Sequence, residues 1–251
     1  MTAVVGVLCK DGVVIGTDSS ATFVHGHQFR TIEQPTDKLH VIKEHVIVAG
    51  TGQVGIDQRF RAITEKGWED KIFQKSPIEV AKHLSRTGIE DLSHTYLKPG
   101  QYGALVAFPF GHKHQLCEFQ IADFQPELKT ERLWYCSMGS AQPITDPFLG
   151  LIREVFWQEG PPPVSEGIFA VTWALEHAIN VNPGGVNDPI RIAILERVDG
   201  GQLKARMLTE SELGQHRQNV EAAKEHLREF SKRHQPGAIE NLEIPKPGSP
   251  E

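Results

Sequence analysis

The chain has 251 residues, of which 39% are hydrophobic and 23% charged, and its formal net charge is −6. This length suits one large domain or at most two, and the acidic balance provides no basic surface for nucleic acid. No apolar run is long enough to span a membrane and no secretory leader is recognisable, so we expect a cytoplasmic protein without a membrane partner. The three cysteines, Cys9, Cys117 and Cys136, lack zinc-site spacing and are expected to be free thiols in strands.

The first part of the chain predicts two hairpins followed by two helices. Four short apolar runs are typical of strands: residues 4–8, 13–17, 39–42 and 46–49. Asp11-Gly12 is a strong tight-turn signal between the first two runs. Helical spacing then appears in residues 56–63 and 78–92, the second introduced by Ser76-Pro77.

The second part repeats this order. We expect strands at residues 101–110, 115–121 and 132–137, helices at 148–157 and 164–179, and closing strands at 190–195 and 203–208. The alternation of strands with helix pairs suits two stacked antiparallel sheets between helical layers. The sequence therefore predicts an α+β protein with a four-layer αββα sandwich.

Three segments organise the chain. Residues 1–209 are expected to form the domain, residues 210–234 an added C-terminal amphipathic helix, and residues 235–251 a mobile tail rich in Pro, Gly and Glu. The helix has one apolar stripe, formed by Val220, Ala223, Leu227 and Phe230. This stripe must pack either on its own domain or on a neighbouring subunit.

Motifs near the N-terminus carry a resemblance to a known family. Thr2 follows the initiator methionine, Asp18 to Thr22 form a D-S-x-A-T box, Asp37 to His40 form a D-K-L-H box, and a glycine turn occupies residues 49–52. In order and spacing these motifs resemble the proteasome β-subunit family of N-terminal threonine hydrolases. Within that family the chain is most similar to bacterial proteasome homologues from outside the actinobacteria, including the beta-proteobacterial type. The resemblance implies the N-terminal nucleophile hydrolase fold and extends, more weakly, to about residue 197.

The same resemblance implies a catalytic group. Thr2 would be the nucleophile after removal of Met1, with its own α-amine as the base. Lys38 would supply a positive charge that keeps this amine neutral, and Asp18 would pair with Lys38. Taken without their motifs, Lys38 would be a surface lysine and Asp18 a turn carboxylate.

Two turns complete the implied site. Gly52 lies fourteen residues after Lys38, which is the family spacing between the lysine and the glycine whose N–H binds the oxyanion. The hydroxyl of Ser140, in the Gly139-Ser140 turn, would hydrogen-bond the Thr2 amine. The alternative for both is a purely local role in a turn.

Substrate contacts are also implied. Thr22 would lie on the strand edge that pairs with an extended peptide, and Gly50 would set the depth of the specificity pocket. Because glycine leaves space, we expect tolerance of large apolar substrate side chains.

The resemblance weakens near the last core helix. The family has an aspartate and, three residues later, a serine before a Gly-Gly pair; aligned on Gly184-Gly185, this chain has Asn180 and Pro183. Asn180 cannot carry negative charge and Pro183 has neither a hydroxyl nor an N–H. Asn180 is therefore expected at most to orient a neighbour of the catalytic group by hydrogen bonding. Either the loop is shifted, with Asn182 or Asp188 compensating, or the site is electrostatically different.

No metal or organic cofactor is expected. His25 with His27 and His112 with His114 have a spacing that could hold a metal ion, but no cysteine or carboxylate cluster adjoins either pair. All four histidines are expected in solvated loops.

These features predict a threonine endopeptidase that cleaves unfolded polypeptides or peptides. By resemblance it would assemble into stacked rings of identical subunits that enclose the active sites, and cooperation with an ATPase stays open. Two alternatives use the same fold: a catalytically silent ring-forming scaffold, and a small-molecule amidase.

Overall fold

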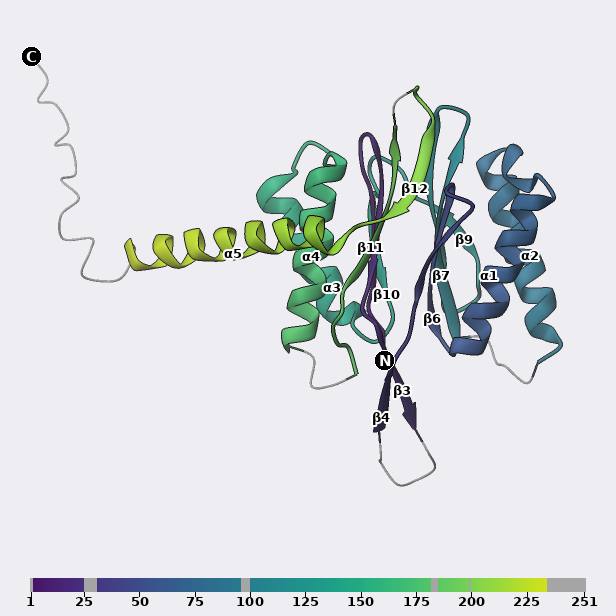
Figure 1. The fold of residues 1–251 in the computed structure, drawn as a ribbon, viewed down its shortest axis with the longest axis horizontal. Coiled ribbons are helices and arrows are strands. Elements are labelled where there is room, and N and C mark those ends of the chain that lie inside the picture. The colour runs from purple at the N-terminus through teal and green to yellow at the C-terminus, as the bar shows by residue number, and fades with distance from the viewer. Residues whose placement is uncertain (1, 25–30, 96–99, 182–184, 199, 234–251) are drawn as a thin grey trace, which may run out of the picture.

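The computed structural model describes residues 2–24, 31–95, 100–181, 185–198 and 200–233. Two five-stranded antiparallel sheets lie face to face between two pairs of helices (Figure 1). This arrangement confirms the predicted four-layer αββα sandwich. The predicted tail at residues 235–251 lies outside the described residues.

The first sheet has the strand order β10-β1-β2-β11-β12. Its strands are β10 (Tyr135–Met138), β1 (Val4–Leu8), β2 (Gly12–Thr17), β11 (Arg191–Arg197) and β12 (Leu203–Met207). Helices α3 (Gln142–Phe156) and α4 (Val164–Val181) cover its outer face. Val4 pairs with Thr17 on one side and with Met138 on the other, so the chain enters this sheet between the ends of β2 and β10.

The second sheet has the order β5-β6-β7-β8-β9. It consists of β5 (Leu39–Ile42), β6 (Val46–Gly52), β7 (Tyr102–Phe110), β8 (Lys113–Phe119) and β9 (Pro126–Leu128). Helices α1 (Val54–Glu69) and α2 (Pro77–Ser93), linked through the 3₁₀ helix η1 (Ile72–Gln74), cover its outer face. The capping box at Ser76 and Glu79 begins α2 at the predicted Ser76-Pro77.

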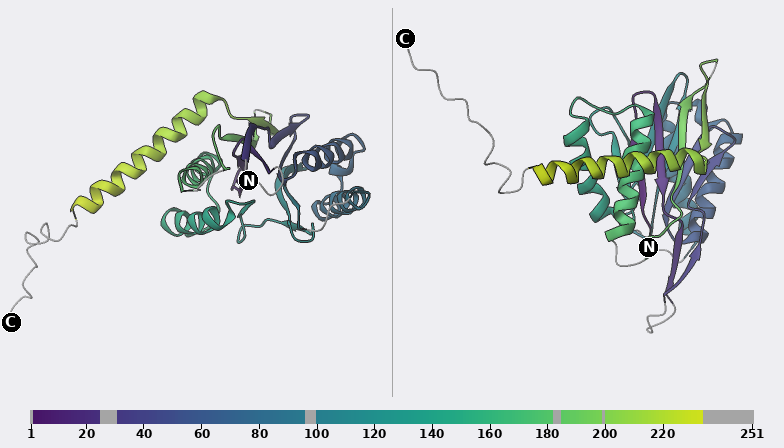
Figure 2. Two further views of the ribbon diagram at one scale, coloured as in Figure 1. Left: turned by 90° about the horizontal axis from the view of Figure 1, so that it is seen from below. Right: turned by 60° about the vertical axis from the view of Figure 1, so that its left-hand side comes forward.

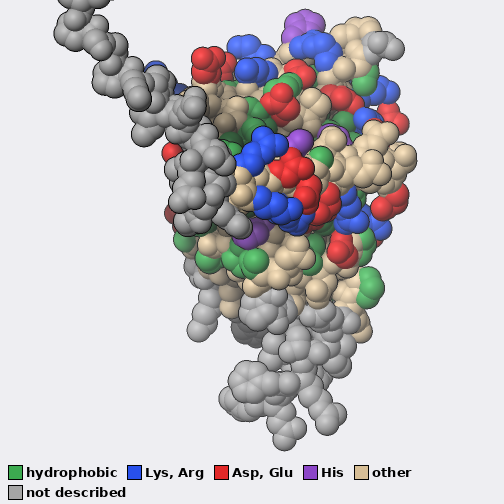
Figure 3. Space-filling model, turned by 90° about the vertical axis from the view of Figure 1, so that its left-hand side faces the viewer, with side chains coloured by type: hydrophobic (Ala, Val, Ile, Leu, Met, Phe, Trp, Pro, Cys, Tyr) green, Lys and Arg blue, Asp and Glu red, His purple; other side chains and the backbone are tan. Residues whose placement is uncertain are grey.

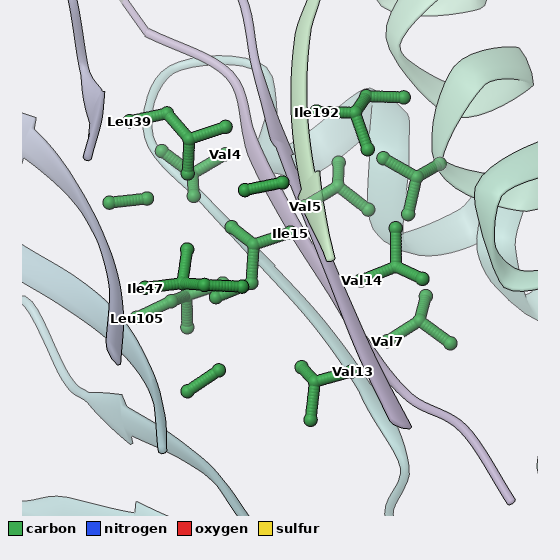
Figure 4. Close-up of a cluster of buried hydrophobic side chains, with 14 of the residues drawn as sticks. Val4, Val5, Val7, Val13, Val14, Ile15, Leu39, Ile47, Leu105 and Ile192 are labelled. Carbon is green, nitrogen blue, oxygen red and sulfur yellow. The ribbon is translucent and has the colours of Figure 1, made fainter. Parts of the chain in front are cut away.

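Strands β1 and β2 are buried on both faces, which explains why their sequences are continuously apolar. A side chain at Gly6 would meet Leu105 and Leu116 of the second sheet, whereas one at Gly16 would meet Val171 and Leu175 of α4. Alternate residues therefore point to opposite layers. Figure 4 shows the result: Ile15, Ile47 and Leu105 fill the space between the sheets, and Val7 and Val14 point toward the helical layer.

Several elements differ from the prediction. Strands β3 (Ser20–Val24) and β4 (Thr31–Pro35), which form a separate two-stranded sheet, were not among the predicted hairpins, and neither was the short β9. Helix α3 begins at Gln142 rather than at residue 148, because Pro147 is accommodated inside the helix. Pro147 is the sixth residue of the helix and removes one backbone hydrogen bond, whereas Pro143 lies in the first turn, where no such bond is lost. All three cysteines are buried free thiols as expected, although Cys9 lies just beyond β1 rather than in a strand.

The C-terminal helix α5 (Glu210–Arg233) docks on α4 with its first half and projects beyond the domain with its second half (Figure 2). Val220 is fully buried against Ile152, Ala170 and Trp173. Toward the end of the helix, Leu227 and Phe230 are 58% and 61% exposed. The apolar stripe therefore packs partly on its own subunit, and a role of its outer end in assembly stays a prediction.

Charged contacts accompany this docking. Arg217 and Lys224 of α5 each lie 3.5 Å from a carboxylate oxygen of Glu176 on α4. On the face of the molecule that carries the end of α5, basic and acidic side chains are interspersed, without a large area of one sign (Figure 3). None of the helices in the described ranges is long and apolar enough to cross a membrane.

Candidate active site

Asp18 joins the two sheets at the end where the chain begins. It follows directly after β2, and its side chain is completely buried. The Oδ1 atom accepts hydrogen bonds from Lys38 Nζ at 2.7 Å and from the backbone N–H of Ala3 at 2.9 Å, and Oδ2 accepts one from the backbone N–H of Ser20 at 3.1 Å. The predicted pairing of Asp18 with Lys38 is confirmed. Asp18 thereby also fixes the backbone next to Thr2.

Thr2 is held by the turn after β10. Its backbone nitrogen donates to Ser140 Oγ at 2.9 Å, and its carbonyl oxygen accepts from the backbone N–H of Ala141 at 3.2 Å. Gly139 has a φ of +94°, and a Cβ there would lie 2.3 Å from the Thr2 carbonyl oxygen. Only glycine suits this position, for both its backbone conformation and its close approach to Thr2. The predicted proximity of Ser140 to the Thr2 nitrogen is therefore present.

A polar network that the sequence did not reveal supports this turn. Thr145 Oγ1 donates to Ser137 Oγ at 2.7 Å, and Ser137 Oγ donates to Asp146 Oδ1 at 2.5 Å. These residues connect the end of β10 to the first turns of α3. Thr145 and Asp146 are consecutive residues of α3, and nothing in the sequence links Ser137 of β10 to them.

Burial gives Lys38 an unusual environment. Desolvation lowers the pKa of its ammonium group below the usual range, and the attraction of Asp18 opposes this shift without cancelling it. Lys38 therefore releases a proton more easily than a surface lysine. This property suits a residue next to a nucleophile whose proton has to be moved.

A cavity of about 360 Å³ opens beside Thr2. Its lining includes Lys38, Gly50, Gly52 and the first residues of α1. Gly52 ends β6 with a φ of +126°, and a Cβ there would lie 2.3 Å from the Gln101 carbonyl oxygen. The structure thus brings the predicted oxyanion glycine and the predicted nucleophile to one cavity, at the start of a helix where backbone N–H groups favour negative charge.

Gly50 does not leave an empty space. A Cβ at Gly50 would lie 2.0 Å from Asp57 Oδ1 and 2.6 Å from the Tyr102 hydroxyl. The volume freed by the glycine is therefore taken up by polar atoms of this chain. The expectation that Gly50 makes room for large apolar substrate side chains is wrong in this respect.

The last part of the expected site is not assembled. Asn180 is exposed near the end of α4, and among the described residues no hydrogen bond joins it to Thr2, Asp18 or Lys38. Asp188 accepts a hydrogen bond from Arg217 of α5 at 2.7 Å, so it does not compensate for Asn180. Asn182 and Pro183 lie outside the described residues.

The structure does not place the remaining candidates from the sequence in the group around Thr2. The backbone of Thr22 pairs with Glu33 in β3 and β4, and its contact with a substrate stays a prediction. His114 lies in β8, partly buried, with Nε2 2.9 Å from the Cys9 carbonyl oxygen, so the expectation of a solvated loop histidine is wrong for it. His25 and His27 lie outside the described residues. In the part of the chain that is described, no three His, Cys, Asp or Glu side chains cluster as metal ligands would.

The four-layer sandwich, with Thr2 leading into its first strand, defines the class of the protein as the N-terminal nucleophile hydrolase fold. The chain belongs to the proteasome subunit family, because the family model described as "Proteasome subunit" matches residues 2–149. No curated protein sequence matches the chain.

Solved structures of similar fold include bacterial proteasome-like β-subunits named Anbu. An Anbu mutant from Hyphomicrobium sp. strain MC1 superposes with a TM-score of 0.70 at 12% identity, covering 94% of this chain and 98% of that chain. Anbu from Yersinia bercovieri, described as an ancestral beta-subunit, gives a TM-score of 0.66 at 14% identity, covering 99% of this chain and 100% of that chain. At these identities the comparison shows the fold alone.

Proposed function

We propose that the protein is a threonine endopeptidase subunit that uses Thr2 as its nucleophile. The observation that supports this most directly is the geometry around Thr2: its nitrogen is 2.9 Å from Ser140 Oγ, and its neighbour Ala3 shares Asp18 Oδ1 with Lys38. A hydroxyl, a nitrogen that becomes a free amine when Met1 is removed, and a buried ammonium group would then act together. This is the set of groups that an N-terminal nucleophile requires.

The proposed reaction has two steps. Thr2 Oγ attacks the scissile carbonyl carbon, its proton passes to the α-amine, and the N–H of Gly52 stabilises the oxyanion. The proton then moves to the leaving amine as the peptide bond breaks, which leaves an ester on Thr2. Water, deprotonated by the same amine, hydrolyses the ester and restores the hydroxyl. Lys38 stabilises negative charge on Oγ in both steps, and Asp18 holds Lys38 in place.

Intact mass and turnover test this proposal together. We expect the purified protein to lack Met1, to cleave fluorogenic peptides, and to lose this activity in Thr2→Ala while keeping its fold by circular dichroism. A matched control is Thr95→Ala, which changes a threonine at the end of the α2 region, away from the cavity. Undiminished turnover in Thr2→Ala would exclude the threonine mechanism.

A silent scaffold is the second candidate, and the exposed position of Asn180 favours it. The family has an aspartate where this chain has Asn180. Without a carboxylate at that position, Thr2 would be held in place but its hydroxyl would not be activated. Retention of Met1 in the intact mass would support the scaffold, because an acylated Thr2 nitrogen cannot act as a base.

We further propose that the protein self-associates into stacked rings. Membership of the proteasome subunit family supports this, as do the exposed apolar side chains of Leu151, Val155 and Phe156 on α3. Native mass spectrometry tests it: a single monomeric species at micromolar concentration would contradict it. Unfolded polypeptides as substrates and a cytoplasmic location stay predictions.

A further inference from the structure

A second cavity lies behind the wall of the cavity beside Thr2. Its volume is about 380 Å³, which is the size of a small-molecule site, and its lining comes from the start of α1, the end of α2, the start of β7 and the turn after β8. The two cavities have no described lining residue in common. Most side chains that line the second cavity are apolar or aromatic, among them Ile56, Leu92, Tyr102, Ile121 and Phe124.

Phe124 is held in the wall of this second cavity in a conformation that bulky residues rarely adopt, with a φ of +60°. Ser85 Oγ donates to the Phe124 carbonyl oxygen at 2.8 Å, and the Phe124 N–H donates to the Gln120 carbonyl oxygen at 2.8 Å. The ring packs so closely on α2 that a Cβ at Gly88 would lie 2.7 Å from its Cε1 atom. Backbone strain that the surrounding residues maintain in this way is common at ligand sites.

Tyr102 belongs to the wall that separates the two cavities. It lines the second cavity, with its ring centroid 5.8 Å from that of Phe124, and its hydroxyl donates to Oδ1 of Asp57 on the lining of the first. The backbone makes a similar connection, because a Cβ at Gly52 of the first cavity would lie 2.3 Å from the carbonyl oxygen of Gln101 of the second. A molecule in the second cavity would therefore touch the residues on which Gly52 and Asp57 are packed.

Asp123 gives the second cavity its charge. It is the only charged residue among the described residues that line this cavity. Its Oδ1 atom accepts a hydrogen bond from the N–H of Gln125 at 3.0 Å, which fixes the exposed carboxylate, and no ion pair joins it to a cation in the described ranges. An apolar cavity with a single carboxylate favours a molecule that has an apolar body and one cationic end.

We propose that the second cavity binds a small organic amine. Its aromatic body would lie against Tyr102, Phe124 and Leu92, and its ammonium group would face Asp123. The bound amine would hold the wall between the cavities in place and thereby stabilise the start of α1. This second site does not require Thr2 to be catalytic.

Binding of phenylbutylamine to the full-length protein, followed by ligand-observed NMR, tests the proposal. We expect saturable binding with a Kd of about 1 mM or tighter, as for other ligands of this size. The neutral phenylbutanol should bind about 5-fold more weakly, which is the effect of one exposed ion pair. Asp123→Asn keeps an acceptor for the Gln125 N–H and should bind the amine and the alcohol equally.

Ser93→Trp fills the second cavity from the end of α2. Ser93 is exposed and lines this cavity, so we expect the larger side chain to abolish binding of the amine while the circular dichroism spectrum stays unchanged. Lys82→Trp is the matched control, because Lys82 is exposed on the same helix and does not line this cavity. No saturable binding to wild type, or equal binding in Ser93→Trp and Lys82→Trp, would overturn the proposal. If Ser93→Trp does not fold, an amine preference that persists in Asp123→Asn would overturn it.

Hydrogen exchange tests the effect on the wall between the cavities. With the amine at about ten times its Kd, backbone amides of residues 53–57 should exchange up to about 10-fold more slowly, because the amine binds only while the wall is in place. Amides of residues 164–167, in the first turn of α4, lie outside both cavities and provide the control. The measurement needs no turnover, so its outcome is independent of the proposed peptidase function. Unchanged exchange of residues 53–57 in the saturated protein would refute the effect on the wall.

Discussion

Replacement of Lys38 by methionine separates the charge of this side chain from its bulk. Asp18 is 0% exposed, and in Lys38→Met it loses the 2.7 Å contact but keeps the hydrogen bonds from the N–H groups of Ala3 and Ser20. Removing one partner of a buried ion pair costs about 3–5 kcal/mol. Because two backbone donors remain, we expect a loss near the lower end, about 3 kcal/mol in the free energy of unfolding.

Activity should fall much further than stability. Loss of a preoriented positive group at the reacting oxygen reduces kcat by about 10³-fold, and we expect at least this loss for peptide hydrolysis. Lys38→Arg is the informative control: it keeps the charge beside Asp18 and most of the stability, but a planar guanidinium group cannot reproduce a compact ammonium group. Urea unfolding and fluorogenic turnover measure the two effects. A folded Lys38→Met protein with wild-type turnover would refute the catalytic role of Lys38.

Four further predictions concern residues outside the Lys38 pair. Gly139→Ala should abolish turnover and lower the melting temperature, because the new Cβ would lie 2.3 Å from the Thr2 carbonyl oxygen; a fully active variant would contradict the close packing. Val220→Ala should cost about 2 kcal/mol in urea unfolding through two lost buried methyl groups and the resulting cavity. Leu227→Asp should instead weaken self-association in light scattering without changing the circular dichroism spectrum; unchanged particle size would remove this helix end from the interface. Burial lowers the pKa of His114 in the folded protein. Below about pH 6.5 the unfolded chain therefore binds a proton at this histidine that the folded protein does not, and the free energy of unfolding should fall as the pH drops. His114→Gln should flatten this pH dependence in urea titrations between pH 5 and 8.

The strands could be predicted where burial on both faces makes them apolar throughout, as in β1 and β2. The start of α3 could not, because Pro147 predicts a helix boundary in the sequence but lies inside the helix in the structure. The hairpin β3–β4 was not predicted, because residues 20–24 and 31–35 are not continuously apolar as β1 and β2 are.

The candidate site, like the fold, could be predicted from the sequence only in part. The Asp18 and Lys38 pair was accessible from sequence because two motifs define its ends. The position of the Asp57 carboxylate beside Gly50 was not, because it depends on the contact between the first turn of α1 and a glycine in β6, and this contact becomes visible only when helix and strand are placed together. The network of Ser137 and Asp146 was hidden for a similar reason, since it crosses from a strand to a helix.

The ion pair of Asp18 and Lys38 also connects the two halves of the sandwich mechanically. Asp18 follows β2 of the first sheet, whereas Lys38 precedes β5 of the second and is tied to it by the hydrogen bond from Gly50 N–H to its carbonyl oxygen. Sliding of one sheet over the other by about 1 Å would break a 2.7 Å hydrogen bond while leaving most apolar contacts in place. The proposed reaction at Thr2 would therefore depend on the alignment of the two sheets. We expect mild denaturant to abolish turnover before the helical circular dichroism signal changes.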